Sequence, residues 1–188
     1  MKSICQSCIK CTLRNIRVLM LGLDGAGKSS LVYQWKLQKY LNTIPRMGLT
    51  VETIHCPQSD IHIYDVSGKP KMRALWRYYA QDTDIMVFVI DSTQRDFKII
   101  YQTKEELSNL MNYRGLANVP FQVLFSKSDL PNSMTDEEIE EEYGLTIGEQ
   151  FIKAEYNHKV MVMKTTALTS NNQNEVLDWM QVASSEQI

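Results

Sequence analysis

The chain has 188 residues, 44% of them hydrophobic, and a formal net charge of -2 at pH 7. This length fits one ordinary domain with a substantial core. The composition and charge exclude a disordered chain and a basic nucleic-acid-coating surface, so we expect no nucleic-acid partner. No apolar run reaches the roughly 18 residues that span a bilayer, and we find no secretory signal at the N-terminus. These features predict a cytoplasmic protein.

Three cysteines, Cys5, Cys8 and Cys11, are closely spaced near the N-terminus, whereas Cys56 lies far along the chain. In a cytoplasmic protein this pattern does not indicate a disulfide framework. A structural zinc site normally needs four ligands, so reduced thiols are favoured over a metal site. The alternative functional interpretation is acylation of the three cysteines, which would give peripheral membrane contact; the plain alternative is a soluble protein.

Apolar runs alternate with helix-like segments along the rest of the chain, the pattern of a sheet wrapped by helices. The predicted strands are 16–23, 49–56, 61–66, 85–91, 121–126 and 160–165. A short polar turn between the second and third predicts an antiparallel hairpin at the sheet edge. The predicted helices are 29–40, 104–113, 135–143 and 174–183, and Thr135 with Glu138 predicts a capping box. We therefore expect an α/β fold with about six mostly parallel strands, one antiparallel edge strand and helices on both faces.

A glycine-rich turn, GLDGAGKS at residues 22–29, joins the first strand to the first helix and matches the P-loop pattern. Glycines let the backbone curl so that its N–H groups face phosphate, and the helix N-terminus adds a positive field. Lys28 is expected to neutralise the β- and γ-phosphates, and the Ser29 hydroxyl to ligate Mg²⁺. The predicted nucleotide-binding residues of this turn are Asp24, Gly25, Ala26, Gly27, Lys28, Ser29 and Ser30.

Two further motifs separate a GTPase from other P-loop proteins. Asp65 and Gly68 form DxxG, a carboxylate that would hold Mg²⁺ through water and a glycine N–H that would meet the γ-phosphate. Ser126, Lys127 and Asp129 follow the fifth strand, where a carboxylate can accept from guanine N1–H and from the amino group. The order and spacing of the three motifs predict binding of GTP and GDP with Mg²⁺. A P-loop kinase is disfavoured by Asp129 and by the lack of a recognisable lid.

Over nearly its whole length the chain resembles the Arf/Arl (ADP-ribosylation-factor-like) branch of the small GTPases. The phrases that carry the resemblance are LGLDGAGKSSLVY, TIPRMGLTVETI, YDVSGKPKMRALWRYYAQDTD, FVIDS, KSDLPNSM and VLDWM. The resemblance implies a P-loop small-GTPase domain over residues 15–184, preceded by a cysteine-containing arm over residues 1–14. It also implies a GTP/GDP switch in intracellular vesicle or protein trafficking or in signalling.

The resemblance further implies contacts with base and partners. The backbone N–H of Ala167 would meet the guanine carbonyl, and protein effectors and regulators would contact Leu49, Tyr64 and Tyr79 on the switch and interswitch surface. For Tyr64, packing into the core is the alternative interpretation. We expect a monomer.

Several positions depart from the family pattern. Arg46 stands where the family has the switch I threonine that ligates Mg²⁺, and a guanidinium cannot ligate a cation. Lys69 stands at the glutamine that orients the attacking water, and lysine cannot accept a hydrogen bond. Ser67 replaces a glycine, and Ser126 replaces the asparagine of the base motif. These changes predict impaired hydrolysis.

Three alternatives remain open at this point. Arg46 would act as an arginine finger in cis, or Arg46 and Lys69 would both be solvated cations on mobile loops. The third alternative is a pseudo-GTPase, an interaction module that keeps the fold but needs no nucleotide. The retained phosphate, metal and base residues disfavour this last interpretation.

Overall fold

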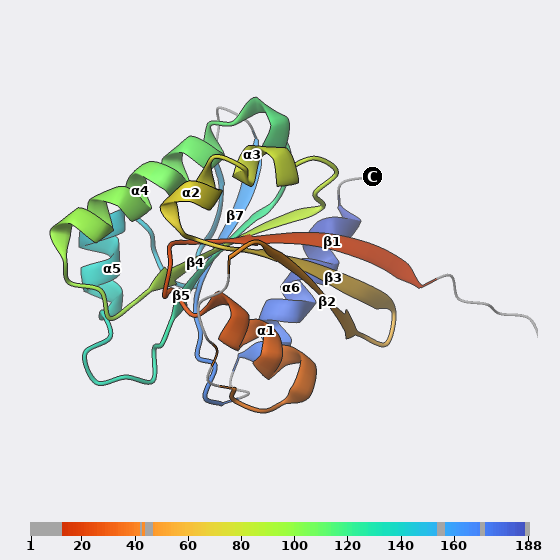
Figure 1. Ribbon diagram of the computed structural model, residues 1–188, viewed down its shortest axis with the longest axis horizontal. Helices are drawn as coiled ribbons and strands as arrows, with labels where there is room; N and C mark the ends of the chain where they lie inside the picture. The colour runs from red at the N-terminus through yellow and green to blue at the C-terminus, as the bar shows by residue number, and fades with distance from the viewer. Residues whose placement is uncertain (1–12, 42, 44–46, 154–156, 170–171, 187–188) are drawn as a thin grey trace, which may run out of the picture.

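The computed structural model describes residues 13–41, 43, 47–153, 157–169 and 172–186. Within these ranges one mixed sheet lies between two layers of helices (Figure 1). The strands are β1 (Arg14–Leu21), β2 (Leu49–His55), β3 (Ser59–Val66), β4 (Ile85–Asp91), β5 (Phe121–Ser126), β6 (Gln150–Lys153) and β7 (His158–Lys164). The helices are α1 (Lys28–Leu37), α2 (Pro70–Arg73), α3 (Trp76–Tyr79), α4 (Phe97–Met111), α5 (Asp136–Tyr143) and α6 (Gln173–Ser185), with a 3₁₀ turn η1 (Arg114–Leu116).

The strand order is β2-β3-β1-β4-β5-β7-β6, and every pair from β3 to β7 is parallel. The predicted hairpin of β2 and β3 is present as the antiparallel pair at one edge. The predicted α/β fold is therefore confirmed. The structure adds the short strand β6, which pairs antiparallel with β7 at the other edge. Four residues are too few to show a strand pattern in the sequence.

The position of β1 explains where a ligand can bind. β1 lies between β3 and β4, and the chain leaves it through α1 and reaches β4 through α2 and α3. In Figure 1, α1 lies below the sheet and α2 and α3 lie above it. The chain thus runs to opposite faces of the sheet after β1 and after its neighbour β3. In open α/β sheets the carboxyl ends of two such neighbouring strands form a crevice for ligands. The loop that follows Leu21 lies at this crevice.

Two apolar clusters, one on each face of the sheet, hold the helices in place. One contains Leu19, Val66 and Phe88 with Trp76 and the inner side of α4. The other contains Val18, Ile63 and Val87 with the inner sides of α1 and α6. Central strands that are covered on both faces must be apolar throughout, and β4 is accordingly buried from Ile85 to Ile90. Helices on both faces are confirmed.

The helix predictions were correct in position but incomplete. The capping box is confirmed, since Thr135 accepts from the N–H of Glu138 and Glu138 accepts from the N–H of Thr135. However, α4 begins at Phe97, seven residues before the predicted start at Lys104. Its first turn is rich in aromatic and β-branched residues, which favour strands locally, but the Asp96 cap and the buried side chain of Ile100 stabilise a helix there.

Among the described helices, none is both long and apolar enough to cross a membrane. Cys5, Cys8 and Cys11 lie outside the described residues. The interpretations of these cysteines as reduced thiols, metal ligands or acylation sites, and the boundary of the N-terminal arm, therefore stay predictions. The remaining cysteine, Cys56, is a half-buried free thiol.

Candidate functional site

The loop between β1 and α1 has the curled backbone that the glycine pattern predicts. Gly25 and Gly27 have φ of 78° and 87°, in the left-handed region that favours glycine. A Cβ at Gly22 would lie 2.2 Å from the carbonyl oxygen of Val89 on β4, so a side chain there would collide with backbone. The loop thus packs against the sheet and delivers the chain into the N-terminus of α1 at Lys28.

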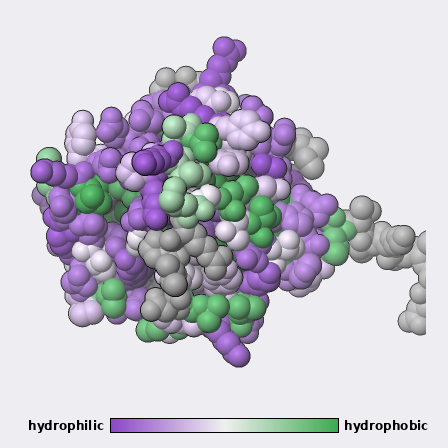
Figure 2. All heavy atoms as spheres, in the orientation of Figure 1, coloured by the Kyte–Doolittle hydropathy of each residue, from purple (hydrophilic) through white to green (hydrophobic). Residues whose placement is uncertain are grey.

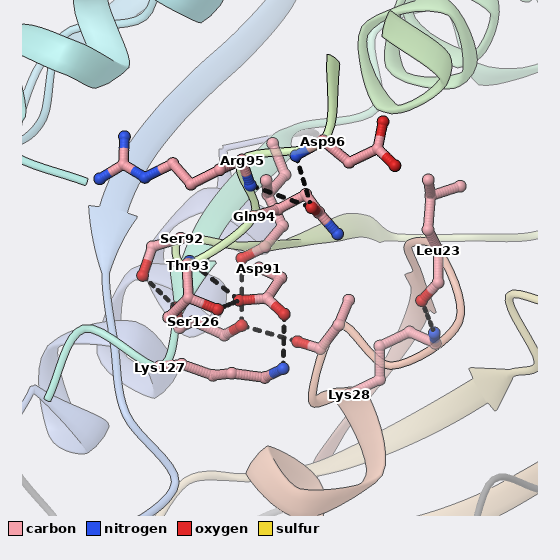
Figure 3. Close-up of polar contacts among 12 residues, drawn as sticks. Leu23, Lys28, Asp91, Ser92, Thr93, Gln94, Arg95, Asp96, Ser126 and Lys127 are labelled. Carbon is pink, nitrogen blue, oxygen red and sulfur yellow. Dashed lines mark hydrogen bonds and ion pairs between the residues drawn. The ribbon is translucent and has the colours of Figure 1, made fainter. Parts of the chain in front are cut away.

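Lys28 is a buried cation held by the loop itself. Its Nζ donates to the carbonyl oxygen of Gly22 at 2.8 Å and to that of Leu23 at 2.9 Å (Figure 3), and only 7% of the residue is exposed. Burial lowers the pKa of Lys28 to about 8, although the nearby carboxylates of Asp65 and Asp24 oppose this shift. Since an ammonium has three donors, one N–H remains for an anionic ligand.

The lowered pKa of Lys28 predicts proton uptake when a phosphate ligand binds. Phosphate stabilises the ammonium, so it raises the pKa from its value of about 8 in the free protein. GDP binding should therefore take up about half a proton at pH 8 and about a tenth at pH 7. Calorimetry in buffers with different ionisation enthalpies measures this uptake. Equal heats in all buffers at pH 8 would contradict the prediction.

The same shift has a consequence for the stability of the free protein. Between pH 8 and the ordinary lysine range the unfolded chain binds more protons at this position than the folded chain does. The contribution of Lys28 therefore makes the free energy of unfolding rise with pH across that window. Well below pH 7 both states are protonated at this position, and this contribution is constant.

Ser29 and Asp65 bring two oxygen ligands together. The Ser29 hydroxyl donates to Asp65 Oδ2 at 2.5 Å, from the first turn of α1 to the end of β3. A hydroxyl and a carboxylate are the hard oxygen ligands that Mg²⁺ prefers, so the pair fits the predicted metal site. Next to it, the hydroxyls of Ser30 and Thr43 lie 3.1 Å apart.

A cavity of about 180 Å³ lies over this loop. Its walls include most of the predicted phosphate and metal residues together with Thr43, Gly48 and Thr50 from the segment before and within β2. The predicted residues among its lining are Asp24, Gly25, Gly27, Lys28, Ser29, Ser30, Asp65, Gly68 and Lys127. Buried ammonium, helix N-terminus and glycine backbone together suit an anion such as a diphosphate.

Gly68 lies directly against the glycine-rich loop. A Cβ at this position would be 2.2 Å from the carbonyl oxygen of Gly22 and 2.5 Å from the backbone nitrogen of Asp24, so only glycine fits. Lys69 follows with extended backbone, φ -63° and ψ 144°, as expected before Pro70. The Lys69 ammonium makes no hydrogen bond or ion pair with another described residue, and Lys69 does not line the cavity.

Ser126 ties the base motif to the glycine-rich loop. Its hydroxyl lies 2.6 Å from the carbonyl oxygen of Ala26 and 3.0 Å from that of Ile90 (Figure 3). The hydroxyl that replaces the family asparagine therefore still links the two segments. Lys127 pairs with Asp91 at 2.5 Å, and its φ of 59° is unusual for a residue with a side chain.

A second cavity, of about 270 Å³, adjoins the first and contains the predicted base residues. Ser126, Lys127, Asp129 and Ala167 all contribute to its walls. Thr166 donates from its hydroxyl to Asp129 Oδ1, and the N–H of Leu168 donates to Thr166 Oγ1 at 3.0 Å. A mostly apolar cavity with an oriented carboxylate fits a purine that offers two donors.

The comparison with known proteins decides the family. A model of the ADP-ribosylation factor family matches residues 1–184. The chain belongs to the ADP-ribosylation factor family. Among solved structures it is similar to the Arl6 (BBS3) small GTPase from Trypanosoma brucei, which was determined with the bound nucleotide analogue GppNp. The two share 25% sequence identity and superpose with a TM-score of 0.78, over 93% of this chain and 99% of that one.

ADP-ribosylation factor family proteins are GTP-binding switches that use GTP, GDP and Mg²⁺ and interact with effectors and regulators. In this member, Leu49 is exposed, whereas Tyr64 and Tyr79 pack partly against the core. The guanidinium of Arg17 lies 4.0 Å above the centre of the Tyr64 ring. Figure 2 shows hydrophobic residues near the middle of the face where Figure 1 shows β2 and β3. The exposed apolar residues before and within β2 and around the start of α3 are Met47, Leu49, Val51, Leu75 and Tyr78.

The structure brings the predicted phosphate, metal and base residues together around the two cavities. Lys69 lies off them, and Arg46 lies outside the described residues. Sequence reasoning missed Thr166, although its position beside Ala167 was a signal. It also missed Asp91, at the end of β4, because its ion pair with Lys127 joins residues 36 positions apart. No local pattern announces such a contact.

Proposed function

We propose that this chain is a guanine-nucleotide-dependent switch with impaired intrinsic GTP hydrolysis, acting in intracellular trafficking or signalling. The observation that carries the proposal is the contrast between the binding residues, which are retained, and Lys69, the altered residue next to Gly68. On one side the phosphate, metal and base residues form two adjoining cavities. On the other, Lys69 offers no acceptor for water and lies off the phosphate cavity. Binding is therefore retained while water positioning is lost.

In this proposal the chain's own groups divide the work. Lys28 and the loop N–H groups would hold the phosphates, and Ser29 and Asp65 would hold Mg²⁺, Asp65 through water. Asp129 with Ala167 would select guanine. Bound Mg²⁺ would supply charge neutralisation at the phosphates. Gly68 offers an N–H to a third phosphate, so GTP and GDP would differ in their contact with this segment. Effectors would read that difference on the surface around Leu49.

Binding of labelled GDP and GTP by the purified chain, with and without Mg²⁺, is the direct test of this proposal. Binding of GDP and GTP with a Kd of about 1 μM or below, together with no binding of adenine nucleotides, supports the switch. Absence of binding to either guanine nucleotide would leave a pseudo-GTPase docking module as the function. For the proposed location, fractionation of cells expressing the intact chain and a Cys5, Cys8 and Cys11 to serine variant distinguishes acyl-dependent membrane contact from a soluble protein.

Mg²⁺ is expected to slow the dissociation of GDP more than that of GTP. Ser29 and Asp65 are retained, but Arg46 replaces the ligand that normally orders switch I with the γ-phosphate. Dissociation rates of labelled nucleotides with Mg²⁺ and with a chelator provide the measurement. Ser29→Ala should weaken the Mg²⁺ effect by roughly tenfold or more. The idea fails if GTP gains at least as much as GDP.

A further inference from the structure

The two peptide groups on either side of the Gly68 α-carbon are each held by a side chain. The carbonyl oxygen of Ser67 accepts from Trp76 Nε1 at 3.2 Å, and that of Gly68 accepts from Arg73 Nε at 2.9 Å. The N–H of Gly68 shares a rigid plane with the Ser67 carbonyl. Fixing both carbonyls therefore fixes the direction in which this N–H points.

Trp76 is itself rigidly placed, because it is buried and packs edge-on against Phe88 of the sheet. Arg73 is different. It closes α2, a four-residue helix without a buried residue, so the core does not hold this helix in place. What restrains Arg73 is Glu106 on the neighbouring helix α4, whose Oε1 lies 3.6 Å from the guanidinium Nη1.

The side chains of Arg73 and Glu106 are largely shielded from water, so solvent screens their attraction less than it screens that of an exposed ion pair. The Arg73 side chain is 10% exposed and that of Glu106 is 24% exposed. A planar guanidinium can address two acceptors in fixed directions, and here it connects α4 to the carbonyl of Gly68. The long, well-packed helix α4 thus restrains the segment that touches the glycine-rich loop.

We propose that Arg73, oriented by Glu106, is a positioning residue that aims the Gly68 N–H at a third phosphate and so sets the preference for GTP over GDP. The inference rests on the proposed nucleotide switch and names a regulatory contact within it. GDP has no third phosphate, so its binding does not use this N–H. Loss of the pair should therefore weaken the triphosphate selectively.

Equilibrium binding of GDP and of GppNp to the full chain with Mg²⁺ tests the proposal in the variants Arg73→Gln and Glu106→Gln. Loss of a charged hydrogen bond predicts about tenfold weaker GppNp binding in Arg73→Gln and a smaller, several-fold loss in Glu106→Gln. GDP affinity should stay within about twofold in both. The double variant should be no worse than Arg73→Gln alone, because Glu106 acts through Arg73.

Arg77→Gln is the matched control, since Arg77 lies four residues further along the chain, on α3, and its guanidinium lies over the ring of Tyr113. Among the described contacts, Arg77 makes none with Ser67 or Gly68. It removes the same charge and should change neither affinity. Amide hydrogen exchange of residues 67–69 in the GDP-bound proteins gives a second readout, which should quicken in Arg73→Gln and Glu106→Gln only. This readout does not depend on triphosphate binding.

Three results would overturn the positioning role. The first is an equal loss of affinity for GDP and GppNp in Arg73→Gln, which indicates a purely structural pair. The second is an unchanged affinity for GppNp in Arg73→Gln. The third is a selective loss of GppNp affinity in Arg77→Gln as well, which indicates a general effect of charge. If the unmodified chain binds no GDP, the proposed switch itself is wrong and this inference falls with it. GDP binding with any of the three results rejects only the inference.

Discussion

GTP pre-loaded on the unmodified chain should be hydrolysed at or below about 10⁻⁴ per second, the order of the slow unassisted rate of small GTPases. Catalysis of this class consists of placing water in line with the γ-phosphate and stabilising charge on its oxygens. Lys28 is available for the second task, with its Nζ anchored on two carbonyl oxygens. The expected defect lies in the positioning of water, because the Lys69 ammonium has no acceptor and makes no hydrogen bond or ion pair with a described residue.

The decisive experiment compares four proteins in single-turnover hydrolysis. These are the unmodified chain, Lys69→Gln, Arg46→Thr and the double variant. Water orientation and switch I assembly act together, so the gain in hydrolysis rate of the double variant should exceed the combined gains of the two single variants. We expect the double variant to hydrolyse GTP at least about tenfold faster than the unmodified chain. The exposed residue Lys71, on α2, offers a matched lysine-to-glutamine control that should change nothing.

Two outcomes would contradict this account of the Lys69 position. One is turnover by the unmodified chain at rates near those of activator-stimulated GTPases, which would favour Arg46 as an arginine finger in cis. The other is a Lys69→Gln change without effect in either background. Pro70 does not prevent recovery, because the extended backbone that it imposes on position 69 suits glutamine as well as lysine.

Asp129→Asn should shift base preference from guanine toward xanthine nucleotides. The carboxylate accepts from two donors on guanine, whereas an amide presents a donor that matches a xanthine carbonyl. Loss of hydrogen bonds to a charged acceptor predicts roughly 100-fold weaker GTP binding with a gain for XTP. A competition assay between GTP and XTP measures the shift, and unchanged selectivity would show that Asp129 does not read the base.

Thr166 provides the control for this change. Its hydroxyl donates to Asp129 Oδ1 and accepts from the N–H of Leu168, so it orients the carboxylate without being a base-reading group itself. Thr166→Val should weaken GTP and XTP binding together by about tenfold and leave the base preference unchanged. A base switch in Thr166→Val would mean that orientation alone decides selectivity.

Much of this protein follows from its sequence alone, where the information is local. The turn at residues 22–29 demands glycine because Gly25 and Gly27 adopt positive φ and Gly22 meets the backbone of β4. The buried strands can be recognised in the sequence, because a central parallel strand is covered on both faces and must be apolar throughout. The capping box at Thr135 needs only residues three positions apart. The fold class and the order of the three motifs were predictable for this reason.

The tertiary structure alone decided how these pieces support one another. Ser126 reaches the carbonyl of Ala26 across 100 positions of the chain, Lys127 pairs with Asp91, and Arg73 connects Gly68 to Glu106. The strand β6 and the first turns of α4 also escaped the sequence patterns, because pairing with β7 and burial of Ile100 stabilise them. Contacts between distant residues depend on the packed sheet and helices, so no local propensity encodes them.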